Sequence, residues 1–233
     1  MRVLVTRPLD DAMETTAQLA ARGHQSVIAP LLEIRFYGGP PISLDGIQAI
    51  LATSSNGVRA LSRRSDRRDL PLFAVGAHTA SIALSLGFSN VRNANGDARA
   101  LAAALPTWAN PQSGALLHVA GAEKPGQFAV DLRALGFDVQ TAALYRAFPV
   151  PRLPAAAREA LQVGNIDAIL LFSPRTAQIF VSCVNDEGLQ ACCRACIVCC
   201  ISEAAAKPLK SLRLPDVRWP SLPNQAGMLA LLE

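Results

Sequence analysis

The segment Ile50–Val58 reads ILATSSNGV, and the interpretation of the whole chain starts from it. Its apolar beginning is typical of a buried parallel strand, the hydroxyl residues and Asn-Gly indicate a tight turn, and the amphipathic continuation predicts the start of a helix. The same pattern returns in Ile169–Ala177, ILLFSPRTA, and similar residues precede both copies, GIQAIL from Gly46 and NIDAIL from Asn165. We therefore interpret the chain as two copies of one α/β unit, each presenting a strand-to-helix turn to a shared cleft.

Further matches show that the order of the two copies is rotated. LFAVGAHTA from Leu72 aligns with VCCISEAAA from Val198, whereas ALLHVAG from Ala115 aligns with RVLVTRP from Arg2. Elements that open the chain thus correspond to elements that close its middle segment. This order arises if the chain begins one domain, leaves to build the second, and returns to complete the first.

The predicted fold class is therefore α/β, with two similar doubly wound parallel-sheet domains of five strands each, flavodoxin-like, one of them discontinuous in sequence. We expect residues 1–35 and 150–233 to form the first domain and residues 36–149 the inserted domain. Two Pro- and Gly-rich breaks, Gly38–Pro41 and Pro149–Pro154, are the expected crossings of a two-stranded hinge.

The first βαβ segment gives specific local expectations. Val3–Pro8 is predicted to be a strand, and Asp10 or Asp11 is expected to cap the following helix. Val27–Ile34 is expected to form one continuous second strand. The helix between them is expected to carry three apolar residues on one face: Met13, Ala17 and Ala20.

Composition sets limits on location and partners. The chain has 233 residues, of which 51% are hydrophobic and 17% charged, so sizeable cores can form. The N-terminal apolar run is too short for a signal peptide, and no stretch approaches the roughly 20 apolar residues of a membrane helix. We expect a cytoplasmic protein without a membrane partner. The net charge of +4 suits an anionic small molecule and is too weak to argue for nucleic acid.

Five of the six cysteines gather between Cys192 and Cys200. Their spacing raises the alternative of a metal site, but a structural zinc site usually joins two separated ligand pairs, and no second pair or nearby histidine follows. Apolar residues alternate with the cysteines, so we favour buried thiols and expect no bound metal. Such a cluster also argues against an oxidising compartment.

Candidate site residues follow from the sheet topology, because parallel sheets bind ligands beyond the carboxyl ends of their strands. Helix N-termini at these ends are good anion sites, although each Ser or Thr there has the simpler interpretation of a helix cap. Six such turns together favour anion binding. The turn residues are Arg7, Thr53, Ser54, Ser55, His78, Thr79, Gly121, Lys124, Ser173, Arg175 and Ser202.

Several standard sites are absent from the sequence. GAEKPGQF from Gly121 has the outer glycines of a P-loop but lacks its Lys-Ser/Thr pair, and no G-x-G-x-x-G follows a strand. The histidines lack metal-ligand spacing. His118 lies within an apolar strand and is interpreted as a packed core histidine, whereas His78 at a turn is the better site candidate.

Taken together, VTRP, ILATSSNGV, FAVGAHTA, LHVAG and LYRA resemble the uroporphyrinogen-III synthase family in order and spacing, over nearly the whole chain. The resemblance implies two α/β domains that close over linear hydroxymethylbilane. It implies loss of the substrate hydroxyl, inversion of the fourth pyrrole ring (ring D) through a spiro intermediate, and closure of the macrocycle, with no cofactor. It also implies a place in porphyrin and heme biosynthesis and leaves room for transient hand-over of substrate from hydroxymethylbilane synthase. We expect a monomer.

The resemblance also assigns residue roles. Tyr145 matches the tyrosine proposed to assist departure of the hydroxyl, with a packed or hinge aromatic as the alternative. Thr53, Ser54 and Thr79 match positions that contact the substrate, and Arg7 and Arg146 are candidate partners for its carboxylates. The competing hypothesis from another class is a non-catalytic two-domain binder of an anionic metabolite, since the same cleft and hinge would serve it.

Overall fold

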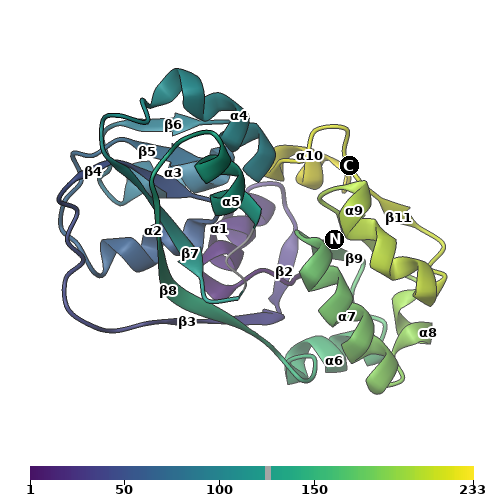
Figure 1. Ribbon diagram of the computed structural model, residues 1–233. Coiled ribbons are helices and arrows are strands. Elements are labelled where there is room, and N and C mark those ends of the chain that lie inside the picture. Colours follow the sequence, from purple (N-terminus) through teal and green to yellow (C-terminus); the bar gives the residue numbers. More distant parts are fainter. Residues whose placement is uncertain (124–126) are drawn as a thin grey trace. The chain divides into compact units, whose positions relative to one another are not determined.

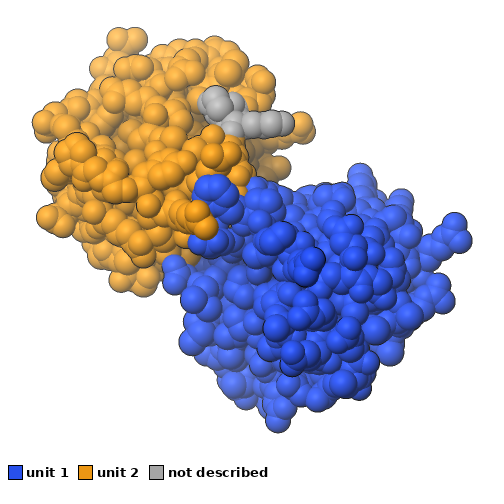
Figure 2. Space-filling view, turned by 90° about the horizontal axis from the view of Figure 1, so that it is seen from below, with its two compact units in different colours: residues 1–33, 148–233 blue, residues 34–147 orange. Residues whose placement is uncertain are grey.

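The computed structural model describes residues 1–123 and 127–233 and is a mixed α/β structure with two sheets. The chain divides into two compact units, coloured separately in Figure 2. Unit 1 comprises Met1–Glu33 and Phe148–Glu233, and unit 2 comprises Ile34–Ala147. The Lys124 turn, expected from the sequence to contribute to the site, lies outside the described residues.

Unit 1 contains a five-stranded sheet in the order β11-β10-β9-β1-β2, in which all neighbouring strands are parallel. Figure 1 labels β2, β9 and β11 of this sheet. Its strands are β1 (Arg2–Val5), β2 (Gln25–Ile28), β9 (Ala168–Leu171), β10 (Ile197–Cys200) and β11 (Val217–Arg218). Its helices are α1 (Leu9–Ala20), α6 (Ala155–Gln162), α7 (Pro174–Asp186), α8 (Gln190–Cys193), α9 (Glu203–Ala206), the 3-10 helix η1 (Lys207–Leu212) and α10 (Gln225–Ala230).

Unit 2 contains a six-stranded sheet in the order β3-β8-β7-β4-β5-β6, and the pairs from β8 to β6 are parallel. Its strands are β3 (Leu32–Phe36), β4 (Ile47–Ala52), β5 (Leu72–Ala74), β6 (Val91–Asn93), β7 (Ala115–Gly121) and β8 (Val139–Pro149). Its helices are α2 (Ser55–Ser62), α3 (Ala77–Ser85), α4 (Ala98–Trp108) and α5 (Gln127–Ala134).

The two sheets confirm the rotated repeat. Read from one end, unit 1 has the order β2-β1-β9-β10-β11 and unit 2 has the order β8-β7-β4-β5-β6, followed at the far side of β8 by β3. The sequence matches pair β1 with β7 and β10 with β5, and these strands occupy equivalent places in the two sheets. The doubly wound fold class is therefore confirmed, with β3 as an additional edge strand that the sequence did not predict.

Successive side chains of β4, a central strand of unit 2, point to opposite faces of the sheet, and each face is covered by a layer of helices. Ile50 and Ala52 pack against the cluster that contains α2 and α3, whereas Ala49 and Leu51 pack against the cluster that contains α4 and α5. All four side chains are almost fully buried. A strand buried on both faces needs this continuous apolar run, and each large side chain contributes about 1.5–3 kcal/mol to stability.

Unit 1 is layered in the same way. Leu4 faces a cluster with α6 and α7, whereas Val3 and Val5 face a cluster with α1 and α10. Within the described residues, no helix is both long and apolar enough to cross a bilayer.

Helix α1 differs from its prediction in two ways. Pro8 occupies the N-cap position and no side chain caps the helix, so the expected cap at Asp10 or Asp11 was wrong. The expected apolar face was also wrong, because Met13 is 57% exposed and the two alanines lie on the exposed side. The residues that the helix buries are Asp11, Ala12, Thr15 and Leu19.

The predicted second strand is divided between the two sheets. β2 ends at Ile28, and β3 begins at Leu32 and joins the sheet of unit 2. Pro30 lies between them and has no backbone N–H for a strand ladder, which explains the interruption. The chain passes between the units after Glu33 and again after Ala147, within β3 and β8 rather than in the Pro- and Gly-rich breaks.

Candidate functional site

Parallel pairing brings most of the predicted site residues to one edge of each sheet. Adjacent strands in unit 2 end in register, with Ala52 opposite both Ala74 and Val119, and Gly121 opposite Tyr145. The predicted residues at this edge of unit 2 are Thr53, Ser54, Ser55, His78 and Thr79, which follow strand ends, Gly121 at the end of β7, and Tyr145 and Arg146 within β8. At the equivalent edge of unit 1 are Arg7, Ser173, Arg175 and Ser202.

Three of the serines act as helix caps. The Ser54 hydroxyl accepts a hydrogen bond from the Asn56 amide at 3.2 Å, and the Ser173 hydroxyl accepts one from the Thr176 amide at 3.0 Å. The Ser202 hydroxyl accepts a longer bond of 3.4 Å from the Ala205 amide. The simpler interpretation of these hydroxyls as caps is thus confirmed, and each cap fixes the direction of the helix N-terminus at the sheet edge.

Thr53 is different, because its side chain contacts the neighbouring strand. Its Oγ1 lies 3.2 Å from Nε2 of His118, which is on β7. The His118 side chain is 5% exposed and meets the Phe128 ring edge-on at a centroid distance of 5.0 Å. The prediction of a packed core histidine is confirmed, yet this histidine also touches a site hydroxyl. Burial lowers its pKa to about 4.

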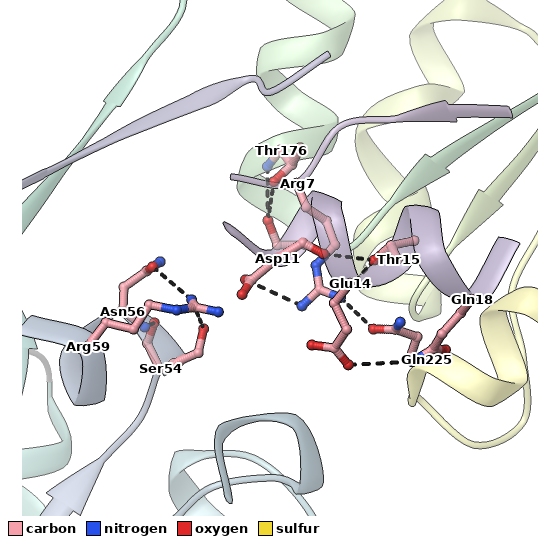
Figure 3. Close-up of polar contacts among 12 residues, drawn as sticks. Arg7, Asp11, Glu14, Thr15, Gln18, Ser54, Asn56, Arg59, Thr176 and Gln225 are labelled. Atoms are coloured by element: carbon pink, nitrogen blue, oxygen red, sulfur yellow. Dashed lines mark hydrogen bonds and ion pairs between the residues drawn. The ribbon is translucent and has the colours of Figure 1, made fainter. Parts of the chain in front are cut away.

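Helix α2 holds its first turn close to β7. Ser55 and Asn56 are buried, and Arg59 Nη1 donates a hydrogen bond to Ser55 Oγ at 3.2 Å. Arg59 Nη1 also donates a hydrogen bond to Asn56 Oδ1 at 3.3 Å (Figure 3). A Cβ at Gly57 would lie 2.6 Å from the carbonyl oxygen of Val119. Glycine is therefore required for this approach, and the Ser55 hydroxyl is engaged inside the helix.

Helix α3 begins without a side-chain cap. Gly76 is its N-cap residue in an extended conformation, and His78 and Thr79 lie in the first turn. The first N–H groups of a helix lack intrahelical acceptors and carry partial positive charge. Since Gly76 offers no capping oxygen, this helix N-terminus suits an anionic group. Thr79 is buried, whereas His78 is half-buried.

Tyr145 lies against the backbone of β7. A Cβ added to Gly121 would be 3.1 Å from the Tyr145 Cζ and 3.4 Å from its hydroxyl oxygen, so the phenol packs directly on this glycine. The register between β7 and β8 shifts at this point, and such bulges redirect side chains at the ends of strands. The Phe36 ring supports the half-buried phenol at a centroid distance of 6.5 Å.

Two arginines of the predicted site differ in their surroundings. Arg146 Nε lies 3.9 Å from Glu123 Oε1 in a pair that is largely accessible, so the guanidinium is offset by a nearby carboxylate. In unit 1, Arg175 is exposed in the first turn of α7. A cation in that position adds positive charge to a helix N-terminus, which already carries partial positive charge.

Arg7 is embedded in a polar network within unit 1 (Figure 3). Its Nη2 lies 3.3 Å from Asp11 Oδ2, and its Nη1 donates to Thr15 Oγ1 at 3.2 Å and to Gln225 Oε1 at 2.6 Å. The guanidinium also covers the Phe172 ring at 4.5 Å. Since the side chain is 9% exposed, these contacts indicate that Arg7 joins β1, α1 and α10 rather than presenting a solvated charge.

Two hollows within unit 1 adjoin the Ser202 turn. The first has a volume of about 470 Å³ and is lined by Ser202, Glu203, Trp219, Pro220, Ser221 and Pro223. The second, of about 250 Å³, shares Glu203 and Trp219 and adds three cations, which are Lys207, Lys210 and Arg213. Trp219 is 47% exposed between them. The indole can stack on an aromatic ring and the basic groups can pair with carboxylates, so this surface suits a ligand that has both.

The cysteine cluster lies in the core of unit 1. Burial raises the pKa of the Cys193 and Cys200 thiols to about 12 and that of Cys196 and Cys199 to about 11. These values keep the thiols protonated and poorly suited to ligate metal. Within residues 1–123 and 127–233, no group of three or more His, Cys, Asp or Glu side chains could hold a metal ion.

Sequence reasoning missed two residues at these edges. His118 was interpreted only as core, since its contact with Thr53 depends on the register that places Leu51 opposite His118. Trp219 was not proposed as a site residue, although the break after β11 at Trp219-Pro220 is a signal for an exposed turn.

Comparisons with known proteins support the sequence resemblance. The family model described as uroporphyrinogen-III synthase HemD matches residues 13–230. The uroporphyrinogen-III synthetase of Helicobacter pylori 26695 has a similar structure, with a TM-score of 0.64 and 16% identity over 100% of this chain and 98% of that one. A mutant uroporphyrinogen III synthase of the extremely thermophilic bacterium Thermus thermophilus gives a TM-score of 0.54 and 17% identity over 100% and 97% of the two chains. Among curated proteins, none matches significantly.

Proposed function

Because the chain belongs to the uroporphyrinogen-III synthase family, we propose that it converts linear hydroxymethylbilane to uroporphyrinogen III, with loss of water and inversion of ring D through a spiro intermediate. The observation that carries this proposal is the family match over residues 13–230. The reaction class is then a cyclising hydro-lyase of tetrapyrrole biosynthesis.

The chemistry of the two sheet edges fits a polycarboxylate substrate. Helix N-termini, hydroxyls and arginines gather at the carboxyl ends of the strands in each unit, and such groups bind anions. The uncapped start of α3 after Gly76 is the clearest single donor group. We assign substrate binding to Thr53, Ser54, His78, Thr79, Gly121, Lys124, Arg146, Ser173, Arg175 and Ser202, with Ser55 and Arg7 supporting the binding turns from within their units.

The reaction requires positioning more than a strong catalytic group. The linear tetrapyrrole is reactive and closes without help to the uninverted isomer, so the protein must hold ring D where its substituted carbon attacks. Holding reacting atoms in this way supplies a large part of a rate enhancement. Tyr145 is the proposed catalytic residue, because its phenol lies at the sheet edge and its O–H can donate to the departing hydroxyl.

We also propose a monomeric cytoplasmic enzyme that receives its substrate by transient hand-over from hydroxymethylbilane synthase. Sedimentation of the purified chain tests the monomer, and a dimer at micromolar concentration would contradict it. The hand-over is tested by comparing substrate made in the same vessel by hydroxymethylbilane synthase with the same amount of substrate added free. Hand-over predicts a larger type III fraction in the first case, and equal fractions would contradict it.

The proposed reaction is tested with freshly generated hydroxymethylbilane. The products are oxidised and the porphyrin isomers are separated by chromatography, beside a control without protein. Predominance of the type III isomer supports the proposal. Production of the type I isomer alone by a folded chain would overturn it.

A further inference from the structure

The contact between Thr53 and His118 indicates which of the two His118 ring nitrogens carries the proton. The two side chains come from neighbouring strands, with Thr53 directly after β4 and His118 within β7. They meet at 3.2 Å through Thr53 Oγ1 and His118 Nε2. The other ring nitrogen, Nδ1, is buried and has no hydrogen-bond partner among the described residues.

A neutral imidazole has one N–H and one bare nitrogen, so two arrangements are available. If Nδ1 carried the proton, a buried N–H would have no acceptor, and such donors are rare in folded proteins. If Nε2 carries it, the N–H donates to Thr53 Oγ1, and only a lone pair on Nδ1 is left in apolar surroundings. The second arrangement loses less hydrogen bonding. Burial also lowers the pKa of His118 to about 4, so the ring is neutral near pH 7.

We propose that His118 is a positioning residue whose Nε2–H group donates a hydrogen bond to Thr53 Oγ1. This bond leaves the Thr53 hydroxyl proton directed toward a substrate carboxylate. This inference rests on the proposed function. Thr53 is partly exposed, and its hydroxyl contacts His118 Nε2.

The arrangement gives the Thr53 hydroxyl a fixed polarity. A hydroxyl can donate or accept, whereas an ionised carboxylate only accepts. If Thr53 donated to His118, its oxygen lone pairs would face the carboxylate and repel it. Because His118 supplies the proton of the internal bond, Thr53 retains its own proton for the ligand.

The tautomer is tested directly on the intact chain labelled with ¹⁵N-histidine. Ring ¹⁵N chemical shifts distinguish a protonated from a bare nitrogen, and a His118→Gln variant identifies the His118 signals by their loss. The expected spectrum at pH 7.5 has a protonated Nε2 and a bare Nδ1. A protonated Nδ1, either alone or in an imidazolium, would overturn the inference.

A double-mutant cycle tests the action of His118 through Thr53. Thr53→Val should lower kcat/KM about 10- to 100-fold, the range for losing a hydrogen bond to a charged group, while Thr53→Ser retains the hydroxyl as a control. His118→Leu should lower kcat/KM about 2- to 10-fold in the wild-type background and have little effect in the Thr53→Val background.

A conservative variant separates positioning from packing. His118→Gln places an amide N–H near the position of Nε2 and should recover most of the activity lost in His118→Leu, with folding of each variant checked by circular dichroism. Equal losses of kcat/KM in His118→Leu and His118→Gln, or additive effects in the double-mutant cycle, would overturn the positioning role. Type III product from the wild type would still uphold the proposed function in that case. Absence of type III product from the folded wild type would overturn both.

Discussion

Gly57→Ala tests the close packing that fixes the Thr53 turn. The added Cβ would lie 2.6 Å from Val119 O and 3.2 Å from Val119 Cγ2. Carbon–oxygen contacts in proteins are comfortable from roughly 3.3 Å, so α2 must move away from β7 by about 0.7 Å. Such overpacking costs about 1–3 kcal/mol, and the better helix propensity of alanine offsets up to about 1 kcal/mol. We expect the free energy of unfolding to fall by about 1–2 kcal/mol.

The assay is chemical denaturation of the full chain, followed by circular dichroism, with the type III product rate measured on the same samples. The matched control is Gly38→Ala, because a Cβ there meets nothing within 4 Å and its φ is not positive. The control should leave the unfolding midpoint nearly unchanged. Gly57→Ala should lower both the midpoint and the rate, since the displaced helix carries the Ser54 cap. Equal midpoints for the two variants would refute the packing argument.

Three further predictions concern Tyr145, His118 and the buried ion pair. Tyr145→Phe should lower turnover by about 100-fold, with little change in substrate-analogue binding, because it removes a proton donor and keeps the ring; turnover at the wild-type level would remove the phenol from the mechanism. Because burial lowers the pKa of His118 to about 4, below its ordinary value of 6.5, the unfolded chain binds a proton between these values that the folded chain does not. The free energy of unfolding should therefore fall by about 3 kcal/mol as the pH falls through this window. In urea unfolding curves measured over a series of pH values, His118→Leu should remove this part of the pH dependence; an unchanged pH dependence would contradict the lowered pKa of His118. Asp11→Ala should lower the free energy of unfolding by about 3 kcal/mol, because it removes the carboxylate that lies beside the buried Arg7 guanidinium, whereas Asp69→Ala, in an exposed pair, should leave it nearly unchanged; similar losses in denaturation experiments would show that burial does not govern these pairs.

The fold class was predictable because its signals are local and repeated. Ile50–Val58 and Ile169–Ala177 combine a strand, a turn and a helix start, and both segments form these elements at equivalent places in the two sheets. The rotated order of the matches was sufficient to predict the discontinuous, doubly wound arrangement.

The errors lie where tertiary contacts override local pattern. The buried face of α1 was predicted wrongly because Met13, an apolar residue, was expected to be buried. The buried side instead includes Asp11 and Thr15, which contact Arg7. That polar burial depends on Arg7, in the turn after β1, and Gln225, in α10, which are far apart in sequence. The pattern of apolar and polar residues within α1 does not indicate such distant partners.

The candidate site was predictable by position and less so by contact. The turns after parallel strands could be identified from small and hydroxyl residues, but the sequence could not separate the capping role of Ser54 from the contact between Thr53 and His118. That difference depends on strand register and on the rotamer of one histidine. The placement of Tyr145 against Gly121 likewise depends on a bulge that no sequence signal indicated.

The central claim, that this chain directs ring inversion during closure of hydroxymethylbilane, is tested most directly by the isomer fraction as a function of protein concentration. Spontaneous closure competes with the enzyme for a fixed pulse of substrate. The account predicts that the type III fraction rises with wild-type concentration until it dominates the product, and that Tyr145→Phe requires much more protein to reach the same fraction. A type I fraction that stays constant over the whole range, with folded wild-type protein, would contradict the claim.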